Sequence, residues 1–146
     1  MNFHRALELL NFQLIYKRRS ILGFFLILCN MDISKIQNQL EKFAIERDWE
    51  QFHTPKNLAM ALSVETSELV EIFQWLKAEE SNNPNQKQIE AINAEVADIA
   101  MYLLRFCSIL EIDLEKAIED KLVKNSEKYP VNLSKGNARK YNQREE

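Results

Sequence analysis

Hydrophobic residues recur at intervals of three and four along the chain from residue 33 onward, and this spacing predicts helices with one buried side. The first predicted helix begins near residue 33 and ends near Trp49. The second runs from about Pro55 to Leu76, with Thr54 as its N-cap and proline at its first position, where a missing N–H does no harm. The buried sides of these two helices are predicted to comprise Ile33, Ile36, Leu40, Phe43, Ala44, Leu58, Ala61, Leu62, Leu69, Ile72, Phe73 and Leu76.

A polar loop, KAEESNNPNQ at residues 77–86, separates these helices from two more. The third helix is predicted from about Lys87 to Leu110, on Ile89, Ile92, Val96, Ile99, Leu103 and Phe106. Asp113 can cap a fourth, which continues through Ala117, Ile118 and Leu122 and ends near Lys128 before Tyr129-Pro130. The basic tail from about residue 131 is expected to be irregular. Short connections favour antiparallel neighbours, so we predict an all-α protein, a compact four-helix bundle.

Composition agrees with an all-α protein of one domain. The chain has 146 residues, of which only two are glycine and three are proline, while 46 % are hydrophobic and 28 % are charged. Its two cysteines, Cys29 and Cys107, have no partner at metal-binding or redox spacing. Cys107 falls in an apolar helical stretch, so we expect a buried, inert thiol.

Residues 1–30 differ from the rest of the chain. They carry four basic residues and one acidic residue, a net charge of +3, while the remaining 15 basic and 21 acidic residues give −6. The stretch YKRRSILGFFLILCN resembles a secretion signal, but its apolar run is too short to span a membrane and lacks a small-residue cleavage site. We expect translation to start at Met31, before the capping residues Asp32 and Ser34; an anchoring segment or an extra helix are the alternatives. The predicted domain is therefore 31–146.

Two pairs of acidic residues border the predicted buried faces of the second and third helices. Glu65 and Glu68 are three residues apart, as are Glu95 and Asp98, so each pair lies on one side of its helix. Four clustered carboxylates cost several kcal/mol without a counter-charge, and neither helix offers basic residues to neutralise both pairs. Hard oxygen ligands suit Mg²⁺ or Mn²⁺, whereas the Glu-x-x-His pairs of di-iron bundles are absent. The alternative is that these acids are ordinary solvated residues.

The motifs around these acids make a family resemblance recognisable. ETSE at 65–68 and EVAD at 95–98 resemble the ExxE…ExxD signature of the MazG-like all-α nucleoside triphosphate pyrophosphohydrolases. FAIERDWEQFHTPKNLAMAL, ELVEIFQWL, EVADIAMYLL and KLVKNSEKYP, followed by ARKY, look like the dCTP pyrophosphatase branch of that group. The resemblance covers about residues 32–142 and leaves residues 1–30 unmatched.

This resemblance implies Mg²⁺-dependent hydrolysis of a deoxynucleoside triphosphate, typically dCTP or a modified dCTP, to the monophosphate and diphosphate. It implies that the four acids bind the metal and that the chain forms a homo-oligomer, a dimer or tetramer, with shared sites. One of the carboxylates can activate the attacking water, and we expect this to be Glu65 or Glu68. We expect a cytoplasmic protein with no nucleic-acid partner and no membrane association. The residues matching the nucleotide site are Trp49, His53, Trp75, Tyr102, Lys121 and Asn125.

Alternatives remain for the activity and for single residues. A broader set of triphosphates is possible within the same fold, and a non-catalytic helical dimerisation module is the hypothesis from a different class. Trp49 and Trp75 are equally typical of core or interface anchors. His53 and Lys121 are compatible with a solvent-exposed surface, and Tyr102 with the core.

Overall fold

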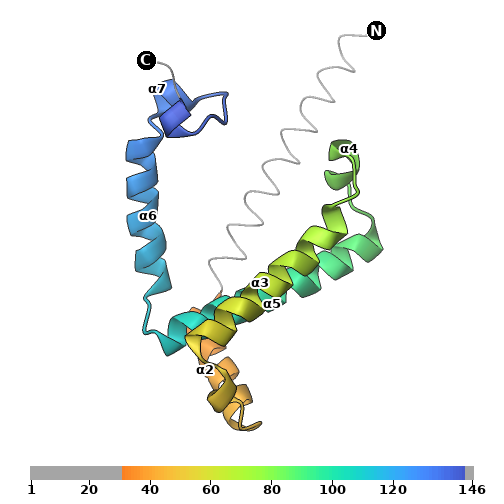
Figure 1. The fold of residues 1–146 in the computed structure, drawn as a ribbon, viewed down its shortest axis with the longest axis vertical. Helices are drawn as coiled ribbons and strands as arrows, with labels where there is room; N and C mark the ends of the chain where they lie inside the picture. Colours follow the sequence, from red (N-terminus) through yellow and green to blue (C-terminus); the bar gives the residue numbers. More distant parts are fainter. Residues whose placement is uncertain (1–30, 144–146) are drawn as a thin grey trace. The chain divides into compact units, whose positions relative to one another are not determined.

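The computed structural model describes residues 31–143, and these residues are helical with no β-strand among them (Figure 1). The all-α class predicted from the sequence is therefore confirmed. The four long helices and the short ones between them are α2 (Ile33–Ile45), η1 (Glu50–Phe52), α3 (Pro55–Phe73), α4 (Ala78–Ser81), α5 (Gln86–Ile109), α6 (Leu114–Lys128), α7 (Val131–Ser134) and η2 (Tyr141–Gln143).

The chain divides into two units, residues 1–38 and 39–146, with the boundary inside α2. The predicted boundary at residue 31 stays a prediction, because the proposed extension and Cys29 lie outside the described residues. Within residues 31–143, no helix is both long and apolar enough to cross a bilayer.

Each long helix begins at a side chain whose oxygen accepts a hydrogen bond from the backbone of the first turn. Three of these caps were predicted from the sequence; of the two capping residues predicted for the first helix, Asp32 and Ser34, the structure uses Asp32. The fourth cap places the start of α5 one residue before its predicted start at Lys87. The backbone N–H groups of Lys35, Asn57, Gln88 and Lys116 donate to Asp32, Thr54, Asn85 and Asp113 at 2.9, 3.3, 3.0 and 3.0 Å.

Two helices end in a left-handed turn made without glycine. Asp48 after α2 and Glu111 after α5 both have φ of 54°. In each turn the next N–H donates back five residues, from Trp49 to Ala44 and from Ile112 to the Cys107 carbonyl, both at 2.9 Å. This is the Schellman arrangement, and it ends α2 at Ile45, short of the predicted end at Trp49.

Three further boundaries differ from the sequence predictions. α3 ends at Phe73, not Leu76, because the extended Lys77 begins a separate short helix, α4, in the predicted loop. The Lys77 N–H donates to the Glu80 carboxylate at 2.8 Å, which is a local cap that the polar composition concealed. The tail expected to be irregular contains α7 and η2.

The extensive helix contact in the described residues is between α3 and α5, which run antiparallel side by side (Figure 1). The most buried apolar residues come from the end of α2, the start of α3 and the last turns of α5, and they are Ala44, Leu58, Leu104 and Cys107. The buried thiol predicted for Cys107 is confirmed, and burial raises its pKa, which makes the reactive thiolate scarcer.

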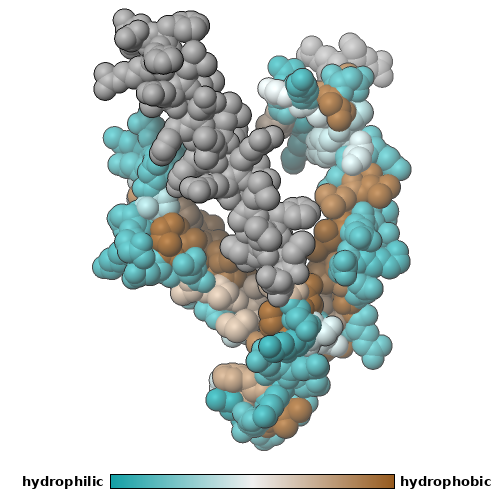
Figure 2. Space-filling model, turned by 180° about the vertical axis from the view of Figure 1, so that it is seen from behind, coloured by the Kyte–Doolittle hydropathy of each residue, from teal (hydrophilic) through white to brown (hydrophobic). Residues whose placement is uncertain are grey.

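Helix α6 keeps its apolar side chains in solvent within a single chain. Ile118, Leu122 and Val123 are 51, 60 and 61 % exposed, so these apolar side chains are not buried in the single chain. The physical reason is that α6 has no extensive contact with another described helix. Hydrophobic residues interrupt the hydrophilic surface at several places on the face shown in Figure 2. Covering such surface, and so removing it from water, gains free energy.

Candidate active site

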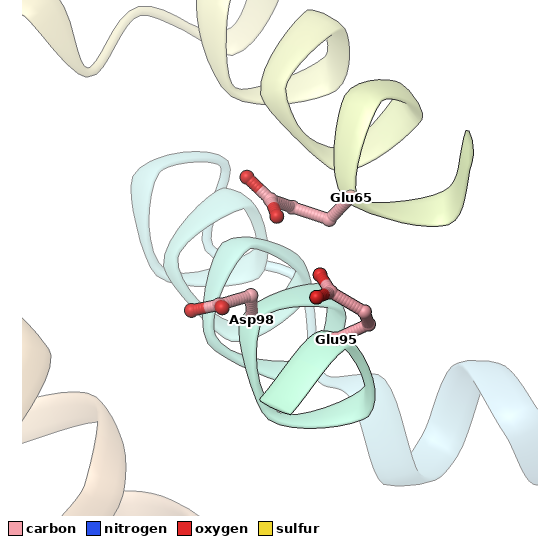
Figure 3. A group of neighbouring side chains, drawn as sticks. All are labelled: Glu65, Glu95 and Asp98. Atoms are coloured by element: carbon pink, nitrogen blue, oxygen red, sulfur yellow. The ribbon is translucent and has the colours of Figure 1, made fainter. Parts of the chain in front are cut away.

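The α3–α5 pair brings the two predicted acidic pairs together. Oxygens of Glu65, Glu95 and Asp98 all lie within 4.8 Å of one another, and these three side chains are half-buried. Figure 3 shows Glu65 reaching from α3 toward α5, with the Glu95 carboxylate directed back toward α3. Glu68 is exposed on α3 and shares a side-chain hydrogen bond with Glu95. All four acids predicted from the sequence thus belong to one cluster.

Loss of water and mutual repulsion both disfavour ionisation of the acids in this cluster. The pKa of Glu65 is raised, first by loss of water around it and then by the charges of Glu68, Asp98 and Glu95. The pKa of Glu95 is raised by the same loss of water, by Glu68 and Asp98, and by its hydrogen bond with Glu68. Each additional ionised carboxylate therefore makes the next ionisation more costly.

No basic side chain relieves this repulsion among residues 31–143. The ion pairs that the described chain forms involve Lys42, Arg47 and Lys116, and none includes an acid of the cluster. An oxygen separation of up to 4.8 Å matches ligands that each lie about 2.0–2.6 Å from one hard cation. The donor set therefore fits a metal ion.

The residues between the two glutamates of α3 stabilise the helix locally. The Thr66 hydroxyl donates to the Leu62 carbonyl at 2.7 Å, and the Ser67 hydroxyl donates to the Ser63 carbonyl at 2.8 Å. Hydroxyls satisfied within their own helix need no partner from the site. Glu65 and Glu68 are therefore the side chains of the ETSE segment that remain available for a ligand.

Two of the predicted nucleotide-binding residues form an aromatic group beside the start of α3. The Trp49 ring packs edge-on against His53, with centroids 6.4 Å apart, and against Phe43 at 5.8 Å. Trp49 remains 44 % exposed and His53 is half-buried. An exposed indole with a fixed orientation can stack on a ligand, whereas a core anchor would be covered.

The other predicted binding residues are more dispersed. Tyr102 lies one turn after Asp98 on α5 and is half-buried. Trp75, just beyond α3, is 86 % exposed, so it is not a core residue of the single chain. Lys121 is exposed and Asn125 half-buried on α6, and no hydrogen bond or ion pair in residues 31–143 joins their side chains to the acidic cluster. A single chain thus assembles the acids but not the whole predicted site.

One residue near the site was missed by the sequence analysis. Arg105 on α5 is only 5 % exposed, and its Nε donates to His53 Nδ1 at 3.3 Å. Its signal in the sequence was a single basic residue inside the apolar run MYLLRFCSIL. A buried arginine usually has a specific partner, because an uncompensated buried charge is costly.

Comparisons with known proteins agree with this geometry. The sequence model of the MazG-like family matches residues 60–143, which include all four acids. The similar curated proteins are called dCTP pyrophosphatase 1, and those of rat, cattle and man are 43, 44 and 39 % identical to this chain over 103 residues. The aligned part is 68 % of this chain, and it spans 60 % of the length of those relatives.

A solved structure shows the same fold over nearly its full length. The crystal structure of a pyrophosphatase from Archaeoglobus fulgidus superposes with a TM-score of 0.65 at 36 % sequence identity. The superposition covers 69 % of this chain and 94 % of the archaeal chain.

Proposed function

The chain belongs to the MazG-like family, and we propose that it hydrolyses a nucleoside triphosphate to the monophosphate and diphosphate. The preferred substrate we propose is dCTP or a modified dCTP, which would give dCMP and diphosphate in nucleotide-pool sanitation. The observation that carries this proposal is the cluster of carboxylates from α3 and α5, with three oxygens within 4.8 Å and no neutralising basic residue among residues 31–143. The names of the mammalian relatives support the choice of dCTP.

We assign the metal to Glu65, Glu95 and Asp98, with Glu68 beside them, and take Mg²⁺ as the ion, with Mn²⁺ as a substitute. Oxygen ligands alone favour these hard cations. When bound, such an ion offsets phosphate charge and positions phosphate oxygens. The raised pKa values of Glu65 and Glu95 support this assignment, because a bound cation would offset both the loss of water and the repulsion among carboxylates that raise them.

The protein side of the reaction is the activation of water. A water oxygen attacks the α-phosphorus, the bond from that phosphorus to the bridging oxygen breaks, and diphosphate leaves. The proton of the water passes to a carboxylate, for which Glu65 and Glu68 are the candidates. Glu68 is the better placed of the two, because it is exposed and stands outside the set of three converging oxygens.

The remaining residues are assigned to the nucleotide. Trp49, His53, Trp75 and Tyr102 offer aromatic or hydrogen-bonding walls for the base, while Lys121 and Asn125 on α6 suit phosphate or sugar. We propose that α6 reaches the acidic cluster of another copy in a homo-oligomer, a dimer or tetramer. The exposed apolar residues of α6 support this assembly. Light scattering coupled to size-exclusion chromatography tests it, and a monomer at micromolar concentration would contradict it.

A substrate panel tests the activity. Purified protein is incubated with each dNTP and NTP, with Mg²⁺ or with EDTA, and released diphosphate is measured as phosphate after adding inorganic pyrophosphatase. Reactions without pyrophosphatase control for direct release of phosphate. We expect diphosphate and dCMP from dCTP only when the divalent ion is present.

The same panel separates the alternatives. Similar turnover of many triphosphates would indicate a broader pyrophosphohydrolase. No turnover of any nucleotide would contradict the enzyme and favour a helical dimerisation module, for which the exposed surface of α6 is the specific observation. The cytoplasmic location expected from the sequence stays a prediction.

A further inference from the structure

The contact between Arg105 and His53 lies apart from the acidic cluster. Arg105 is nearly covered at 5 % exposure, and its Nε donates to His53 Nδ1 at 3.3 Å across 52 residues of sequence. Within residues 31–143, Arg105 forms no ion pair with a carboxylate. The buried, permanently charged guanidinium therefore has a ring nitrogen as its partner instead of a carboxylate. This arrangement is energetically unfavourable, which suggests that it has a function.

Donor and acceptor chemistry determines the protonation state of His53. Arginine has N–H donors and no acceptor, so Nδ1 of His53 must supply a lone pair. A neutral imidazole that accepts at Nδ1 carries its proton on Nε2, and a protonated ring has no lone pair to offer. The contact thus selects one form of three, the neutral ring with Nε2–H as a hydrogen-bond donor.

The electrostatics act in the same direction. The pKa of His53 is lowered, first by burial and then by the charge of Arg105, while Glu50 on η1 opposes the shift. Among residues 31–143, Arg105 and Glu50 are the charged groups that contribute to the shift. The ring is therefore held neutral around and above its ordinary titration range, with Nε2 having no hydrogen-bond partner among the described residues.

The position of the contact relates it to the acids. Arg105 follows Asp98 by seven residues on α5, which places the two on the same side of the helix, about 10 Å apart along its axis. His53 is also in edge contact with Trp49, which stays partly exposed. The length of a nucleotide is of this order, so a nucleotide whose phosphates lie at the acids would extend its base toward the aromatic group.

We propose that Arg105 is a positioning residue that holds His53 as the Nε2–H tautomer, so that His53 offers a fixed donor to an acceptor atom on the base of the bound nucleotide. The base-binding part of this proposal rests on the proposed function; the tautomer part does not. A fixed donor contributes to affinity only for a base edge with an oxygen or unprotonated nitrogen there, because a second donor would meet it unpaired.

Two substitutions at Arg105 isolate the hydrogen bond. Arg105→Gln places an amide N–H₂ at the same number of bonds from the backbone as arginine Nε, whereas Arg105→Met places a methyl group there. Both remove the charge, so a difference between them reports the donor alone. Thermal unfolding verifies that both fold, and Arg105→Leu is the donor-free variant if the methionine protein does not.

Nitrogen-15 NMR of the imidazole rings gives the tautomer without requiring turnover. The chain has two histidines, His4 and His53, so His4→Gln assigns both signals. We expect a single Nε2–H form of His53 in the native protein and in Arg105→Gln, and a mixture of tautomers in Arg105→Met. Lys87→Met, which removes an exposed cation from the first turn of α5, should leave the native pattern. Identical His53 spectra for the glutamine and methionine variants would overturn the proposal.

Steady-state kinetics with dCTP test the role in binding. We expect Arg105→Met to raise KM about fivefold with kcat within about twofold, the size expected for one misdirected neutral hydrogen bond. Arg105→Gln should stay near the native KM. A tautomer change with no change in KM would overturn the contact with the base, while absence of all turnover in the native protein would contradict the proposed function and leave the spectroscopic result standing.

Discussion

The middle of the α3–α5 pair and the end where α3 begins and α5 finishes differ in the side chains that lie between the two helices. In the middle, oxygens of Glu65, Glu95 and Asp98 lie within 4.8 Å of one another, and loss of water together with repulsion among the acids raises the pKa values of Glu65 and Glu95. At the end, where α3 begins and α5 finishes, Leu58, Leu104 and Cys107 are at most 4 % exposed, and Arg105 is the buried charged residue among residues 31–143.

This difference separates stability from function along one pair of helices. The apolar end gains free energy from burial and supports the geometry of the middle. In the middle, the clustered carboxylates destabilise the fold. A protein that bound no ligand at these charges would become more stable if they were replaced. We therefore expect substitutions at the end to act on folding and substitutions in the middle to act on activity.

The largest expected effect is on folding, from Leu58→Ala. Leu58 is 2 % exposed, so truncation leaves a cavity and should lower the free energy of unfolding by about 3 kcal/mol. Urea denaturation at fixed protein concentration measures it. Met60→Ala, on the same helix at 61 % exposure, is the matched control and should cost less than about 0.5 kcal/mol. Equal losses would show that the start of α3 is not part of the core.

Glu95→Gln is the corresponding change in the middle. We expect kcat/KM for dCTP to fall at least 100-fold, about 2.7 kcal/mol of transition-state stabilisation, because an amide oxygen carries no charge for the metal. Circular dichroism should show an unchanged helical spectrum. Glu71→Gln, at an exposed position on α3, is the control. Retention of more than about a tenth of the activity would remove Glu95 from the metal site.

The pH dependence of stability without metal sharpens the same contrast. A carboxyl with a raised pKa destabilises the fold while it is ionised, so this cost is present above the folded pKa and disappears as pH falls through it toward the ordinary value near 4.5. In EDTA, Glu95→Gln should therefore melt at a higher temperature than the native protein at pH 7, and the two should converge on acidification. Added Mg²⁺ should reverse the order at pH 7. A difference that did not vary with pH would contradict the repulsion.

The smallest expected effect is at the turn after α5. Glu111 has φ of 54°, which strains any residue with a β-carbon, so Glu111→Gly should raise the free energy of unfolding by about 0.5–1 kcal/mol. Glu111 lies outside both compared regions, so activity should not change. Glu115→Gly, in the first turn of α6, should instead destabilise, because glycine disfavours a helix. A loss of stability in both variants would show that Glu111 makes a stabilising contact.

Local features were predicted well because local interactions produce them. The caps at Thr54 and Asp113 and the end of α6 before Pro130 follow from hydrogen bonding and steric effects within a few residues. The ends of α2 and α3 were placed too late, since apolar periodicity continued past them. The turn at Asp48 adopts a conformation that glycine usually signals, so its position was not evident from residue type.

The sequence by itself determined that the chain is helical, where its long helices start, and that two acidic pairs lie three residues apart beside apolar faces, because helix periodicity and capping depend on neighbours in the chain. Only the tertiary structure decided that Glu65 meets Glu95 and Asp98, that Arg105 binds His53 across 52 residues, and that α6 keeps its apolar residues exposed. Those outcomes depend on which helix faces pack together, a choice set by burial summed over distant residues.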